Sequence, residues 1–131
     1  MGGSQGVHVW CYHIGTDTGH MVDMAEAIGM LVAVEDVVLD GTIESGYACD
    51  RESVGLVAKR KGDTTALLVS DYGPDPGPAT VAVPGRAELE VTDLFTGEVV
   101  GRLDAERRRF RAELKRTFTA RLYRLQPPAT P

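Results

Sequence analysis

The sequence predicts a mainly β protein: an antiparallel β-sandwich of about seven or eight strands, preceded by one amphipathic helix and a short strand. Three observations support this fold class. After residue 41, short β-prone runs alternate with turns that contain Gly or Pro. Residues 20–36 instead show the apolar spacing of a helix. At 131 residues and 43% hydrophobic, the chain has room for one domain with a genuine core.

The leading segment, residues 1–41, is predicted to contain a strand, a loop and the helix. Residues 7–12, VHVWCY, alternate as a short strand does, and the loop HIGTDTG follows them. From His20 to about Asp36, apolar residues recur every three or four positions, as on one face of a helix. Asp40 and Gly41 then break this pattern.

The sandwich is predicted over residues 42–125, with a disordered proline-rich tail at 126–131. Its strands are expected at about 43–49, 54–61, 65–72, 79–83, 87–93, 98–103, 108–114 and 119–125. The loop GPDPGP at 73–78 should lie exposed at one end of the sheets, because proline has no N–H to donate to a ladder. The predicted core contains Leu67, Val69, Val81, Val83, Leu89, Val91, Phe110, Leu114 and Leu122.

The segment EVTDLFTGEVVG, residues 90–101, predicts a β-hairpin. Leu89 and Val91 point to one face, while Glu90 and Thr92 point to the other, as in a sheet with one dry and one wet face. Gly97 suits the positive φ of a tight loop with a bulge. The hairpin is therefore predicted to be part of the sandwich wall.

The charge balance argues against nucleic acid as a partner. A net charge of −5 and a pI near 5.1 leave no broad basic surface for phosphates. The run ERRRFR at 106–111 is a local exception that predicts a solvated sheet face around Phe110. Contact with a polyanion or an acidic sugar is the other interpretation of this run.

No stretch approaches the roughly 20 apolar residues that cross a bilayer, so no membrane partner is expected. The first residues lack the basic and apolar regions of a signal peptide. We expect a soluble chain and leave its compartment open. Cys11 and Cys49 fit either free thiols or one disulfide.

Candidate chemistry is sparse. His8, Cys11, His13 and His20 carry zinc-ligand side chains, but their spacing matches no established zinc pattern, so neither a metal nor a cofactor is predicted. The acidic residues Glu35, Asp36 and Asp40 are expected to be solvated at a helix end. No serine nucleophile elbow and no phosphate loop is present, so no catalytic residues are assigned.

The apolar helix side needs a covering surface, either the sandwich itself or a second copy of the chain. Aromatic rings near it suit burial in an interface or stacking on a sugar. The predicted docking or sugar-stacking residues are Trp10, Tyr12, Met21, Met24, Ile28 and Leu31.

Three motifs resemble a known family. ALLVSDYGPDPGPATVAVPG (66–85), VTDLFTGEVVG (91–101) and TARLYRL (119–125) are similar to strands and hairpins of the C-terminal β-sandwich that follows the catalytic barrel in β-galactosidase-like glycoside hydrolases and related enzymes. Asp71 stands where that family more often has Asn. Residues 7–41 resemble the last barrel strand, its loop and the final barrel helix, with Trp10 at the end of that strand.

This resemblance implies a non-catalytic accessory domain that packs against a catalytic barrel of the same parent chain or against a second copy. The two carboxylates that cleave glycosidic bonds would belong to the barrel. Two other functions stay open. A carbohydrate-binding module would need a row of exposed aromatic residues, for which Tyr47, Tyr72, Phe95, Phe118 and Tyr123 are the candidates. A hydrolase fragment, acting through the histidine loop, is the other alternative.

Overall fold

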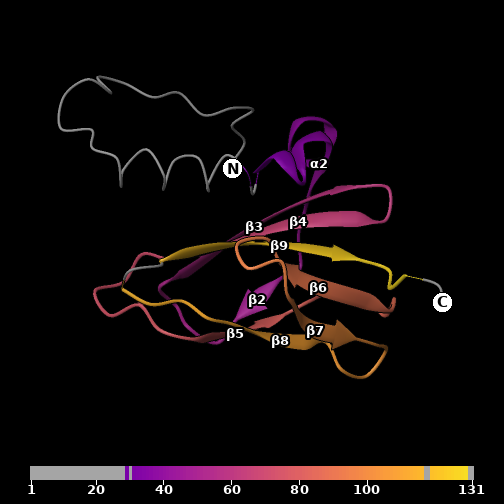
Figure 1. Cartoon of the computed structure of the whole chain (residues 1–131). Helices are drawn as coiled ribbons and strands as arrows, with labels where there is room; N and C mark the ends of the chain where they lie inside the picture. The colour runs from indigo at the N-terminus through magenta and orange to yellow at the C-terminus, as the bar shows by residue number, and fades with distance from the viewer. Residues whose placement is uncertain (1–28, 30, 117–118, 130–131) are drawn as a thin grey trace, which may run out of the picture.

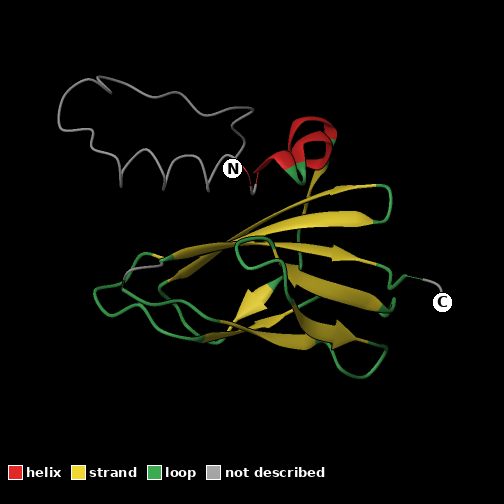
Figure 2. Ribbon diagram, viewed as in Figure 1, coloured by secondary structure: helices red, strands yellow, loops and turns green. Residues whose placement is uncertain are grey.

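The computed structural model describes residues 29, 31–116 and 119–129. In this part of the chain, nine strands form two antiparallel sheets and one short helix lies outside them, which confirms the predicted sandwich (Figures 1 and 2). The helix is α2 (Glu35–Asp40). The larger sheet has the order β1 (Thr42–Glu44), β3 (Val54–Lys61), β4 (Thr64–Asp71), β9 (Ala120–Gln126), β6 (Leu89–Asp93) and β7 (Val99–Leu103). The smaller sheet has the order β2 (Ala48–Cys49), β5 (Ala79–Ala82) and β8 (Arg109–Ala112).

The main core lies between the two sheets. Leu67, Val69, Val81 and Val91 are fully buried there, because every second residue of each strand points inward. The rings of Phe110 and Tyr123 meet edge to face across the core, with centroids 5.0 Å apart. The predicted core is confirmed except for Leu89, which is half-buried at its rim, and Leu122, which is buried on the opposite face of the larger sheet.

A second, smaller core lies on the outer face of the larger sheet. Here Val34, Val37 and Val38 pack against Ala66 of β4 and Leu122 of β9. The prediction of one helix that ends at about Asp36 is wrong. Gly29, Leu31 and Val32 are helical, the chain turns at residues 33–34, and the separate helix α2 then runs to Asp40, with Val37 and Val38 packed over the sheet.

The predicted strand at 43–49 is in fact two strands in different sheets. β1 pairs with β3 in the larger sheet, whereas β2 pairs with β5 in the smaller one. The chain crosses between the sheets at residues 45–47, where Gly46 has a φ of 98°. A side chain at this position would be strained, so the sequence Ser-Gly marks the crossing point.

The hairpin of β6 and β7 forms as predicted. Gly97 has a φ of 76°, and the register shifts between Val91 and Thr92, as in a β-bulge. The expected wet face is wrong at Thr92, which is only 7% exposed. That position pairs with Arg124 of β9 inside the larger sheet, where neighbouring side chains exclude water.

The loop at 73–78 connects β4 of the larger sheet to β5 of the smaller one, and Pro74, Asp75 and Pro78 are exposed, as expected. Among the described residues, no helix is long and apolar enough to span a membrane. The division of the chain into residues 1–41, 42–125 and 126–131 stays a prediction.

Candidate docking surface

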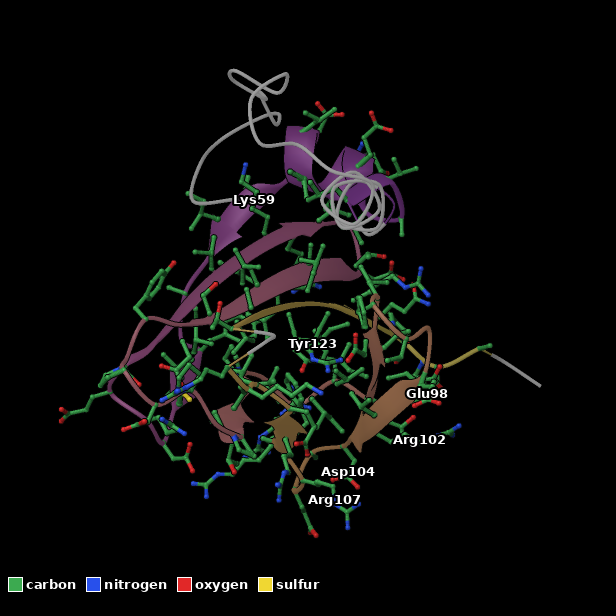
Figure 3. The ribbon with its side chains drawn as sticks, turned by 60° about the vertical axis from the view of Figure 1, so that its left-hand side comes forward. Lys59, Glu98, Arg102, Asp104, Arg107 and Tyr123 are labelled. Carbon is green, nitrogen blue, oxygen red and sulfur yellow. The ribbon has the colours of Figure 1, made fainter. Side chains whose placement is uncertain are left out.

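The outer face of the larger sheet carries the helix and is the candidate docking surface. Figure 3 shows Lys59 on this side, beside α2, whereas Asp104 and Arg107 lie at the opposite side of the molecule. The chain reaches the sandwich through α2, which contacts β3 and β4 (Figure 1).

Lys59 of β3 fixes α2 to the sheet. The side chain of Lys59 is buried, with the residue 6% exposed, and its Nζ donates to the carbonyl oxygen of Val38 at 2.9 Å. A cation at the end of a helix satisfies a carbonyl that has no partner inside the helix and interacts well with the helix dipole. Lys61 lies 3.8 Å from Asp36 and 3.4 Å from Asp40 on the exposed rim.

Exposed apolar side chains lie beside this helix. Val32 is 61% exposed, Leu39 on α2 is 38% exposed and Ile43 on the edge strand β1 is 71% exposed. We call these three residues the α2 patch. Exposed apolar side chains on one element and the adjoining edge strand are typical of a surface that another protein segment covers.

A buried donor on the same face also lacks a partner. The side chain of Arg124 leaves β9 between Ala66 of β4 and Thr92 of β6, and its Nε is buried with no acceptor among the described residues. An unpaired buried donor costs about 1 to 3 kcal/mol. Sequence patterning did not reveal this residue, because an arginine on an outward strand position normally indicates solvent.

The motif VTDLFTG has a structural role. The carboxylate of Asp93 accepts the N–H of Phe95 at 2.8 Å and binds Arg121 of β9 at 2.5 Å. Both side chains of this ion pair are nearly buried, at 5% and 10% exposure, and the guanidinium of Arg121 lies 5.5 Å from the ring of Phe95. The motif therefore holds the hairpin loop against β9.

Asp71 organises the loop at 73–78. Its two carboxylate oxygens accept the N–H groups of Gly73 at 2.9 Å and Gly77 at 3.4 Å. The N–H of Gly73, the hydroxyl of Ser53 and the nearby charge of Arg51 lower the pKa of this carboxyl. An Asn, the more frequent residue in the resembled family, would offer only one acceptor oxygen.

The acidic residues near the helix do not form a catalytic pair. Asp36 and Asp40 have side chains 72% and 69% exposed, and Lys61 lies between them. No group of three or more His, Cys, Asp or Glu in the part of the chain that the structure describes could hold a metal ion. The histidine loop, with Cys11, lies outside the described residues.

Of the predicted docking residues, Leu31 is described. It is partly buried and packs against the core beneath α2. The other predicted docking residues, Trp10, Tyr12, Met21, Met24 and Ile28, lie outside the described residues, so their role stays a prediction.

The aromatic candidates for sugar stacking form no row among the described residues. Tyr72 is 81% exposed, but Tyr123 is buried and Phe95 is half-buried below Arg121. The hydroxyl of Tyr47 donates to Glu44 at 2.7 Å, and burial, followed by this carboxylate, raises the pKa of Tyr47 well above its ordinary value. Phe118 lies outside the described residues.

No protein-family model matches the chain, and no curated protein matches its sequence. Two of the solved structures that match its fold are α-amylases. An α-amylase of Anoxybacillus, described as a new glycosyl hydrolase subclass, has 18% sequence identity and a TM-score of 0.62, over 90% of this chain and 25% of that chain. The α-amylase from Geobacillus thermoleovorans, solved with acarbose, has 15% identity and a TM-score of 0.61, over 88% of this chain and 25% of that chain.

At these identities the likeness concerns the fold alone. The chain spans about a quarter of the length of the solved proteins that it matches. It therefore has the fold of a segment of two α-amylase chains, each of which is about four times as long as the part that matches.

Proposed function

We propose that this chain is a non-catalytic accessory domain of a glycoside-hydrolase-like protein, docked on a catalytic barrel through the outer face of its larger sheet. The observation that carries the proposal is the shared fold with about a quarter of two α-amylase chains, over nine-tenths of this chain in the better-covered match. A domain of this kind stabilises and positions its neighbour, and the chemistry resides in the barrel.

The surface features support docking on the helix side. The α2 patch offers apolar contact area. A neighbouring domain that covers the patch would remove these apolar side chains from water. The chain also reaches the sandwich from this side, through α2.

The first experiment is an activity assay of the purified chain on starch and on chromogenic α- and β-glycosides. We expect no hydrolysis by the chain alone. The same assay on a longer parent protein that includes an upstream barrel would assign the parent: cleavage of starch indicates an α-amylase-like parent and cleavage of β-galactosides indicates a β-galactosidase-like one. Hydrolysis by the isolated chain would contradict the proposal.

The second experiment tests the docking face. In a parent protein, Ile43→Lys should separate the unfolding of the sandwich from that of the barrel, seen as two transitions in calorimetry. The control is Val100→Lys, because Val100 is also an exposed apolar residue, 40% exposed, on the opposite edge strand β7. Equal effects of both changes would contradict docking through the helix side.

A second copy of the chain is the other candidate partner. If the α2 patch mediates a dimer, sedimentation velocity will show a concentration-dependent dimer of the isolated chain that Ile43→Lys abolishes. A monomer at all concentrations leaves the barrel as the partner.

A carbohydrate-binding module has weaker support. It would need a row of exposed aromatic residues, and of the aromatic candidates that the structure describes Tyr72 alone is exposed. Calorimetric titration with neutral oligosaccharides tests it, and specific heat would favour binding.

A further inference from the structure

The outer face of the smaller sheet contains a shallow hollow of about 280 Å³. It lies in the layer opposite the one that carries α2, so it is separate from the docking face (Figure 1). Its lining consists of Ala48, Cys49, Asp50, Thr80, Ala82 and Arg109. The hollow exists because the outward positions of β2 and β5 hold small side chains: Ala48 pairs with Ala82, and neither fills the space above the sheet.

Arg109 provides a positive charge at this hollow. It is exposed on β8 opposite Ala82, and it forms no ion pair or side-chain hydrogen bond with any other residue that the structure describes. Two of its neighbours on the basic run have partners: Arg108 donates to the carbonyl oxygens of Pro84 and Ala87, and Arg111 pairs with Glu113 at 2.6 Å. The fork of a free guanidinium matches a carboxylate in two-point geometry.

Asp50 provides an acceptor at the same hollow. Its Oδ1 accepts the N–H of Thr80 at 2.9 Å and the thiol of Cys49 at 3.7 Å, which fixes the side chain at the edge of β5. Within the described chain, Oδ2 has no hydrogen-bond donor. A ligand here needs a carboxylate for Arg109 and a hydroxyl to donate to Asp50, because a second bare carboxylate would be repelled by Asp50.

We propose that this hollow binds a sugar acid, a uronic acid residue with a carboxylate, ring hydroxyls and an apolar ring face. The carboxylate pairs with Arg109, a hydroxyl donates to Asp50, and the apolar ring face lies on the methyl groups of Ala48 and Ala82. The basic run at 106–111 then binds a ligand in addition to forming a solvent-exposed face of the sheet. The proposal does not depend on which protein covers the opposite face.

The test is an NMR titration of the isotopically labelled chain with glucuronate, and separately with glucose and with acetate. For a ligand of this size in an open hollow, a dissociation constant of about one millimolar is expected for glucuronate. The amide signals of residues 48–50 and 80–82 should shift and saturate. Glucose and acetate, which each carry only part of the recognised chemistry, should bind at least about tenfold more weakly.

Two variants and a matched control locate the site. Arg109→Gln should weaken glucuronate binding by about tenfold or more, since it removes a charge-assisted contact. Ala82→Leu should also weaken binding, because it fills the hollow. Arg111→Gln is the control: Arg111 is exposed two residues along the same strand but does not line the hollow. It should leave binding unchanged.

Three results would overturn the proposal. The first is the absence of a saturable shift with glucuronate at about ten times the expected dissociation constant. The second is equal binding of glucose or acetate, which would remove the assignment to a sugar acid. The third is an equal loss in Arg109→Gln and Arg111→Gln, which would indicate a diffuse charge effect and no defined site.

Discussion

At the scale of single residues, two carboxylates stabilise the loops that gave the sequence its family resemblance. Asp93 pairs with Arg121 in a nearly dry setting and also accepts the N–H of Phe95. Asp71 accepts N–H groups from both ends of the loop at 73–78. Each carboxylate fixes the backbone of a loop by accepting its N–H groups. The motifs are therefore explained by their contribution to folding.

Asp93→Ala should lower the free energy of unfolding by about 3 to 5 kcal/mol, because it leaves the buried guanidinium of Arg121 without its carboxylate. The measurement is urea denaturation followed by circular dichroism. Glu98→Ala is the control, since Glu98 is exposed in the same hairpin, and its effect should stay within about 0.5 kcal/mol. Equal effects would show that the pair does not hold the hairpin loop.

The stabilisation from Asp71 should depend on pH. Its pKa is lowered in the folded state, so the carboxylate stabilises the fold above its ordinary pKa near 3.8, and this contribution is lost as the pH falls through the lower folded value. The melting temperature of the unmodified chain should exceed that of Asp71→Asn at neutral pH, and the difference should shrink below about pH 4.

The control for this pH effect is Asp75→Asn in the same loop. The side chain of Asp75 is 88% exposed, so its change should leave the melting temperature nearly constant at every pH. A difference between the unmodified chain and Asp71→Asn that persists undiminished at pH 2 would contradict the assigned role of the Asp71 charge.

At the scale of elements, α2 depends on β3 more than on its own sequence. The helix has six residues, and Val34 at its start provides no side-chain cap. Isolated helices of this length are unstable in water, so packing and the bond from Lys59 must hold it. Through its contacts with β3 and β4, α2 packs on two inner strands of the larger sheet.

Lys59→Met should therefore loosen α2 without unfolding the sandwich. The carbonyl of Val38 loses its donor, and we expect a loss of about 1 to 2 kcal/mol and faster hydrogen exchange at residues 37–41. Lys61→Met is the matched control, because Lys61 makes only exposed ion pairs worth less than about 1 kcal/mol. If both changes speed exchange equally, Lys59 does not fix the helix.

At the scale of the whole molecule, the larger sheet separates two cores. Its inner face closes the sandwich against the smaller sheet, and its outer face carries α2. The two sheets also meet where β7 contacts β8, and Gly101 allows this close approach: a methyl group in its place would lie 3.1 Å from the Cβ of Phe110. The inner core is the larger one and should govern cooperative unfolding.

Val91→Asp should abolish cooperative thermal unfolding, since Val91 is fully buried between the sheets and an unpaired charge there has no partner. Differential scanning calorimetry provides the measurement. Val100→Asp, at an exposed position in the same hairpin, should leave a sharp transition. A cooperative melt of Val91→Asp near that of the unmodified chain would show that this inner face tolerates a charge.

The strand pattern was predictable because it is local. Alternation with period two, together with Gly and Pro turns, located the sandwich and nearly all of its inner core, including Leu67, Val81 and Phe110. The hairpin at 90–101 was predictable for the same reason, since glycine readily adopts the positive φ that the turn requires at Gly97. The docking residues Trp10, Tyr12, Met21, Met24 and Ile28 remain predictions from sequence.

Other features depend on contacts between distant segments. The sequence did not show that residues 42–49 divide between two sheets, that Leu122 faces a second core, or that Lys59 is buried under a helix. The hollow at Arg109 arises only when β2, β5 and β8 lie side by side. Local backbone preference therefore determined the kind of fold, whereas the tertiary structure decided which outward faces are covered, because covering a face requires partners that no local pattern specifies.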